Sequence, residues 1–100
     1  MATTLQHVVQ RLKATEPELR RRGVAHLSLF GSLARGEAKD DSDIDIAVEI
    51  EAGRSFSVIR MEDTRLLLED VLGRPVDLGE VESFRPTVRA AFEQDQVRVF

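Results

Sequence analysis

The fold of this chain is decided by Leu29-Phe30-Gly31-Ser32 and, after a ten-residue gap, by Asp43-Ile44-Asp45-Ile46-Ala47-Val48. The first stretch predicts a strand that ends in a glycine turn onto a short helix, and the second predicts another strand. Because side chains alternate across a strand, Asp43 and Asp45 share one face, while the apolar residues between and after them point into a core.

Two neighbouring carboxylates repel each other unless a cation lies between them. Mg²⁺ is commonly held by one or two carboxylates together with substrate phosphates. The glycine turn adds free backbone N–H groups at the start of a helix, which attract phosphate. The two motifs together predict metal-assisted chemistry on a nucleotide.

Composition narrows the function classes. The chain has 100 residues, 42% of them hydrophobic and 32% charged, and we expect a single domain over residues 1–100. It has no cysteine, which excludes disulfides and thiolate metal sites. The net charge is −4, and the five aromatic residues are all phenylalanine. Both features argue against a dedicated nucleic-acid binder. We find neither a membrane span nor a signal peptide, so the expected compartment is the cytoplasm.

The rest of the chain alternates between helical and strand patterns. Helices are predicted over residues 5–12, 15–22, 57–72 and from 83 onward, and strands over residues 24–30, 43–50, 76–78 and 97–100. Thr15 and Ser83 are the expected helix caps, and Gly23 is the expected helix end. The helix over residues 57–72 is expected to have an apolar side made of Val58, Ile59, Met61, Leu66, Leu67, Val71 and Leu72. The fold class is therefore α/β (α+β), with helices packed against a short mixed sheet.

The string Phe30-Gly31-Ser32-Leu33-Ala34-Arg35-Gly36-Glu37, followed by Asp41-Ser42-Asp43-Ile44-Asp45, resembles the polymerase-beta-like nucleotidyltransferase superfamily. It looks most like the minimal nucleotidyltransferase (MNT) branch. Gly73-Arg74-Pro75-Val76-Asp77-Leu78 also looks like a strand segment of that branch, so the resemblance covers nearly the whole chain.

The resemblance implies roles for individual residues. Asp43, Asp45 and Asp77 would be the catalytic carboxylates and would hold two Mg²⁺ ions, while Gly31 and Ser32 would hold the nucleotide phosphates. Arg35 lies where it could reach a phosphate.

Structural explanations compete with each of these roles. Asp43 and Asp45 could lie on a solvated strand face, and Asp77 could pair with an arginine, with Glu80 as a rival for its role. Ser32 could be an ordinary helix cap, and Arg35 could form a surface salt bridge to Glu37 or Asp41. The arginine run at residues 20–22 is typical of a solvated helix end, with an RNA or partner contact as the alternative.

The resemblance further implies the transfer of AMP from ATP to a hydroxyl on a partner protein. That partner would be a helical HEPN ribonuclease toxin, which this chain would neutralise as an antitoxin. One alternative is a non-catalytic antitoxin that acts by contact alone, and another is an antibiotic nucleotidyltransferase with an acceptor site across a homodimer. We expect apolar surface for a partner or second copy on the helix over residues 57–72 and at residues 97–100.

Overall fold

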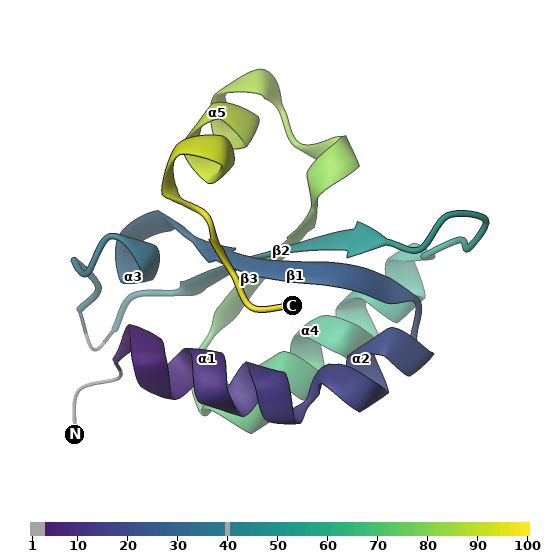
Figure 1. The fold of residues 1–100 in the computed structure, drawn as a ribbon, viewed down its shortest axis with the longest axis horizontal. Coiled ribbons are helices and arrows are strands. Elements are labelled where there is room, and N and C mark those ends of the chain that lie inside the picture. Colours follow the sequence, from purple (N-terminus) through teal and green to yellow (C-terminus); the bar gives the residue numbers. More distant parts are fainter. Residues whose placement is uncertain (1–3, 40) are drawn as a thin grey trace.

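A computed structural model describes residues 4–39 and 41–100 and contains each helix and strand predicted from the sequence. In chain order the elements are α1 (Leu5–Ala14), α2 (Glu16–Arg21), β1 (Val24–Phe30), α3 (Gly31–Ala34), β2 (Ile44–Ile50), α4 (Val58–Leu72), β3 (Val76–Glu80), the 3₁₀ helix η1 (Val81–Ser83), α5 (Pro86–Asp95) and β4 (Val97–Arg98) (Figure 1). None of the described helices is both long and apolar enough to cross a membrane.

The strands form one mixed sheet in the order β3-β2-β1-β4. β1 runs antiparallel to β2 and to β4, whereas β2 and β3 are parallel. In this register Asp45 lies opposite Phe30 on one side and opposite Asp77 on the other. The starts of β2 and β3 therefore meet at the end of β1, where the glycine turn begins.

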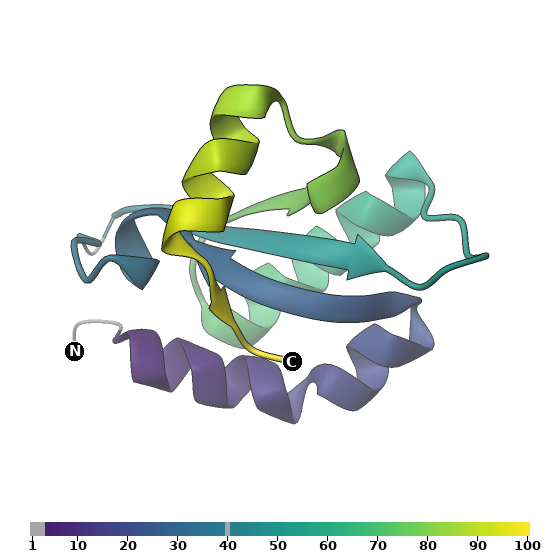
Figure 2. The ribbon, with the colours of Figure 1, turned by 45° about the horizontal axis from the view of Figure 1, so that its top comes forward.

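The two faces of the sheet are covered differently, as Figures 1 and 2 show. Helices α1, α2 and α4 pack on one face, and α5 crosses the other. Strand alternation sends Ile44, Ile46 and Val48 into the larger core beneath α1, α2 and α4. Ala47 lies in a smaller cluster with Phe92 of α5. Asp45 is on the same side of β2 as Ala47, so its carboxylate points to the face that α5 covers only in part.

Two of the predicted helix caps are wrong. The Thr15 hydroxyl donates to the carbonyl oxygen of Arg11 at 3.0 Å and makes no capping bond, because α1 runs almost directly into α2 and leaves Thr15 in a helical conformation. Ser83 ends η1, and α5 instead starts after Arg85, where no side chain supplies a capping hydrogen bond. Ser57 does cap α4, since its hydroxyl accepts from the backbone N–H of Arg60.

The residues predicted for the apolar side of α4 are divided between the core and the solvent, since Met61, Leu67 and Leu72 pack against the larger core. Val58 is 87% exposed, Ile59 77% and Leu66 50%, and the fully buried residues are Thr64 and Leu68. Thr64 tolerates burial because its hydroxyl donates to the carbonyl oxygen of Arg60 at 2.8 Å. Helix α4 thus leaves apolar side chains exposed, as expected for a partner surface.

The chain end does not offer such a surface. Val99 is only 5% exposed and belongs to the larger core, because the last residues pair with β1. The expectation of exposed apolar surface at residues 97–100 is therefore wrong.

Candidate active site

The glycine turn and the second carboxylate fit together directly. Gly31 follows β1 with a φ of +75°, a conformation that residues with a side chain rarely adopt. A Cβ added to Gly31 would collide with Asp45 Oδ2 and would lie 3.0 Å from Asp45 Cγ. Only glycine therefore allows the Asp45 carboxylate to lie against the backbone of the turn.

Asp45 is the carboxylate with the strongest electrostatic strain. Burial raises its pKa above the usual value, and the negative charges of Asp77 and then Asp43 raise it further, while Arg35 lowers it. Asp43 and Asp77 are exposed, so Asp45 is the least solvated of the three. The ionised carboxylates thus repel each other across neighbouring strand starts, which is the arrangement that a cation would relieve.

The residues fit a divalent cation that is shared with a substrate. Among residues 4–39 and 41–100, no three acidic or histidine side chains are arranged as a ready metal-binding group. Asp45 and Asp77 nevertheless line the same cleft. Mg²⁺ typically takes one or two carboxylates and completes its shell with phosphate oxygens and water. The donor set therefore suits a nucleotide-bound Mg²⁺ better than a cage built by the protein alone.

Two residues that the sequence analysis missed position the carboxylates. The Arg74 guanidinium donates to the carbonyl oxygens of Lys39 and Ser42, just before Asp43. Glu69 Oε2 accepts from the backbone N–H of Val76 at 2.9 Å, just before Asp77. These bonds fix the two chain segments from which the carboxylates project. The Arg74 bonds join parts of the chain that are 35 and 32 positions apart, so no local pattern could reveal them. The Glu69 bond spans only seven positions and links α4 to the start of β3.

Asp45 and Asp77 line one side of a cleft of about 570 Å³ between the sheet and the start of α5, whereas Asp43 is not among the residues that line it. Its other side is built by Phe84, Arg85, Thr87 and Val88. The ring of Phe84 packs 5.6 Å from that of Phe30 and 5.8 Å from that of Phe92, measured between ring centroids.

This wall depends on a second glycine. A Cβ on Gly79 of β3 would collide with the Phe84 ring and would lie 3.1 Å from Phe84 Cζ. Gly79 thus lets the ring lie directly on the strand, beside the cleft.

The predicted site residues do not all lie in the cleft. Gly31, Asp45 and Asp77 line the cleft, and Ser32 follows Gly31 in α3. Because α3 has only four residues, its macrodipole is small, and a phosphate there would depend on backbone N–H groups and the Ser32 hydroxyl. Arg35 donates to Glu37 at 3.0 Å and to Asp95 at 2.6 Å, which ties α3 to the end of α5. The salt-bridge alternative for Arg35 is therefore confirmed with Glu37, and its phosphate contact stays a prediction.

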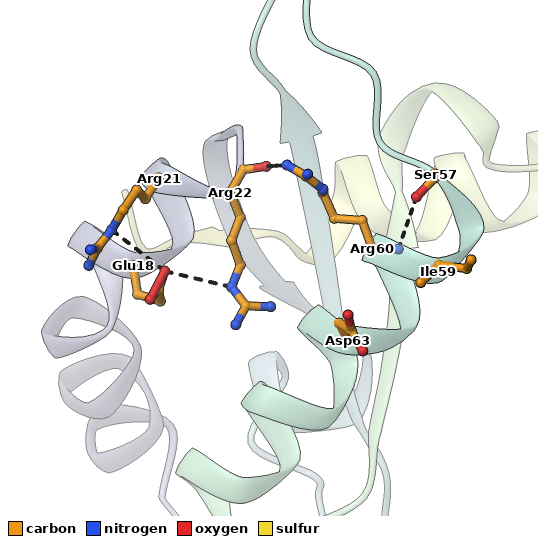
Figure 3. Close-up of a pocket in the computed structure, with 7 residues that line it drawn as sticks. All are labelled: Glu18, Arg21, Arg22, Ser57, Ile59, Arg60 and Asp63. Carbon is orange, nitrogen blue, oxygen red and sulfur yellow. Dashed lines mark hydrogen bonds and ion pairs between the residues drawn. The ribbon is translucent and has the colours of Figure 1, made fainter.

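A second pocket, of about 470 Å³, lies between α2 and the start of α4 (Figure 3). Arg21 and Arg22 of the arginine run line this pocket together with Arg60, but all three guanidinium groups already have partners. Arg21 and Arg22 lie 3.6 and 3.8 Å from Glu18, and Arg60 donates to the carbonyl oxygen of Arg22 at 3.2 Å. The structure thus favours a solvated helix end with local ion pairs, and none of the predicted site residues lines this pocket.

Comparison with known proteins decides the family. A profile of the nucleotidyltransferase domain matches residues 12–99, which include every predicted site residue. The chain belongs to the nucleotidyltransferase domain family. It is 43% identical over 97 residues to the protein adenylyltransferase MntA of Thermococcus cleftensis, and the alignment covers 96% of each chain. The family resemblance and the enzyme class expected from the sequence, a nucleotidyltransferase, are confirmed.

Solved structures confirm the fold. A structure described provisionally as a minimal nucleotidyltransferase is 32% identical, with a TM-score of 0.78 and 95% of each chain covered. A toxin–antitoxin structure with AMP-PNP is 24% identical, with a TM-score of 0.75 and coverage of 90% of this chain and 72% of that one. A chain in the structure of a tri-AMPylated Shewanella oneidensis HEPN toxin in complex with MNT antitoxin is 21% identical, with a TM-score of 0.68 and coverage of 92% of this chain and 71% of that one.

Proposed function

We propose that this chain is a cytoplasmic, Mg²⁺-dependent protein adenylyltransferase that moves AMP from ATP to a hydroxyl on a HEPN-type toxin and so acts as its antitoxin. The observation that carries the proposal is the contact between Asp45 and the Gly31 turn, with Asp77 in register beside Asp45. Carboxylates for a metal and a backbone turn for phosphates are thereby held at one end of one cleft. Membership of the nucleotidyltransferase family supports this cleft as the reaction centre.

The residues divide the work of nucleotidyl transfer. Gly31 and Ser32 would hold the phosphates of ATP, and Asp43, Asp45 and Asp77 would hold divalent metal. The bound metal would neutralise phosphate charge and lower the pKa of the acceptor hydroxyl. The acceptor oxygen forms a bond to the α-phosphorus, the bond from that phosphorus to the bridging oxygen breaks, and pyrophosphate leaves. Asp77, which is exposed in the cleft, would take the proton from the acceptor hydroxyl.

The choice of donor and acceptor is supported by relatives. The relative from Thermococcus cleftensis is named a protein adenylyltransferase, which favours a protein acceptor. The toxin–antitoxin structures of this fold contain AMP-PNP in one case and an AMPylated HEPN toxin in another. These proteins favour ATP as donor and a HEPN protein as acceptor here.

Intact-mass spectrometry tests the proposal. The purified chain is mixed with its cognate helical partner, ATP and Mg²⁺, and each transferred AMP adds roughly 329 Da, a value set by the chemistry of nucleotidyl transfer. Asp77→Asn should abolish the mass increase while the complex still forms.

A control without Mg²⁺ should also show no increase. If the wild-type mixture binds ATP and forms the complex but no partner gains mass, the transfer proposal is wrong. The exposed apolar residues of α4 would then favour an antitoxin that acts by contact alone.

A further inference from the structure

Among the described residues, Arg85 is the one arginine without a hydrogen bond or ion pair. Every other arginine makes a hydrogen bond or ion pair within the described part of the chain, to a carboxylate, a backbone carbonyl or both. Arg85 has no such partner among residues 4–39 and 41–100, and it is exposed. A guanidinium that has no partner in the described part of the chain, where the other arginines are paired, is available to a ligand.

Arg85 also has a specific place. It lines the same cleft as Gly31, Asp45 and Asp77, on the opposite wall. It is the residue that precedes α5, a helix of ten residues that begins at Pro86 and has no side-chain cap. Thr87, in the first turn of that helix, also lines the cleft, so the positive end of the helix lies at the same wall as Arg85.

The charges of the cleft indicate what Arg85 binds. The carboxylates on the sheet side repel one another, and the arginine that lowers the pKa of Asp45 is Arg35, which is already held by Glu37 and Asp95. Arg85 therefore does not serve to neutralise Asp45. It offers a separate positive charge on the far wall, and guanidinium groups match phosphate oxygens in charge and in bidentate geometry.

We propose that Arg85 binds the pyrophosphate portion of the nucleoside triphosphate, at the end of the phosphate chain away from Asp45 and Asp77. This inference rests on the proposed function and adds a residue to it. The carboxylates with their metal would hold the reacting α-phosphate, and Arg85 would hold the group that leaves. Arg35, the phosphate contact expected from the sequence, would keep a structural role between α3 and α5.

Calorimetric titration of the intact chain with ATP and with pyrophosphate, each with Mg²⁺, tests this role. Arg85→Ala should weaken both ligands by about 10- to 100-fold, the range expected for loss of a charged hydrogen bond. Arg85→Lys should lose less, because it keeps the charge but not the bidentate geometry. The melting temperatures of both variants should equal that of the wild type, since Arg85 makes no hydrogen bond or ion pair with any residue that the structure describes.

Arg89→Ala is the matched control. Arg89 lies one turn further along α5 and pairs with Glu93 at 3.2 Å, outside the cleft lining, so its loss should leave both affinities unchanged. Wild-type affinity of Arg85→Ala for both ligands, or an equal loss in Arg89→Ala, would overturn the proposal. A wild-type chain that binds ATP but transfers no AMP would refute the transfer reaction alone, whereas one that binds neither ligand would refute both.

Discussion

The contact between Gly31 and Asp45 can be tested by comparing two glycines with the same backbone conformation. Gly31 and Gly36 both have a φ of +75°, but a Cβ on Gly36 would have no heavy atom within 4 Å. Alanine at either position should cost about 1–2 kcal/mol of folding free energy, because a residue with a Cβ is strained in the left-handed region. Alanine at Gly31 must in addition displace the Asp45 carboxylate.

The second cost can be estimated from the effect of extra groups in a well-packed site, which is about 1–3 kcal/mol. Gly31→Ala should therefore unfold at a lower urea concentration than Gly36→Ala. Its melting temperature should be lower by about 4–8 °C for each kcal/mol of excess in a domain of this size. Because Asp45 is moved, Gly31→Ala should also lose the thermal shift produced by Mg²⁺ and ATP, which Gly36→Ala should keep.

Equilibrium urea unfolding of the two single variants, repeated in an Asp45→Ala background, isolates the cause. Removal of the Asp45 carboxylate removes the group that the new Cβ meets, so the excess cost of Gly31→Ala should disappear there. Equal costs for Gly31→Ala and Gly36→Ala, or an excess that survives in the Asp45→Ala background, would refute the reasoning.

Three further predictions concern the surroundings of this contact. Because the folded pKa of Asp45 is raised above its usual value of 3.8, its ionised form costs stability at neutral pH, and that cost is lost as pH falls through the raised pKa towards 3.8. Asp45→Asn should therefore melt higher than the wild type at pH 7 in thermal scans, and a gain that persists at pH 3.5 would contradict this. Arg74→Met should lower the free energy of unfolding by about 1.5–3 kcal/mol, because two backbone carbonyls lose a charged donor. Arg98→Met, at an exposed position, is the control and should change the free energy of unfolding by less than about 0.5 kcal/mol. Gly79→Ala should cost about 1–3 kcal/mol in urea unfolding because the Phe84 ring must move; no loss would show that the ring does not need the glycine.

The sequence could predict what depends on short-range periodicity. The alternation of Asp43 and Asp45 with apolar residues set the strand and its faces, and Gly31 marked the turn after β1. Thr15 and Ser83 had the composition of helix caps, but their conformations were decided by neighbouring elements, with α1 continuing almost into α2 and η1 taking up Ser83. Local preference is weak against such tertiary constraints.

The wall of the cleft that the sequence did not predict depends on contacts between residues far apart in sequence. Arg35 meets Asp95 across 60 positions, so the arginine that the sequence placed near a phosphate also ties α3 to α5. Arg85 enters the cleft only because α5 folds back over the sheet before β4 pairs with β1. Arg35 lies in the motif that precedes the first two carboxylates, whereas Arg85 lies in no motif that the sequence analysis used. Only the fold reveals that Arg35 is paired with Asp95 and that Arg85 lines the cleft.

Two acidic residues near the starts of β2 and β3 show how structural and functional carboxylates differ here. Glu69 accepts from Arg65 at 2.7 Å and from the backbone N–H of Val76, so its charge is satisfied within the folded chain. Asp45 meets a turn that excludes every side chain and two further negative charges. Loss of the Glu69 charge should therefore weaken the fold, whereas loss of the Asp45 charge should strengthen it and remove metal-dependent nucleotide binding. Opposite signs of the stability change identify Asp45 as a group whose partner comes from outside the chain.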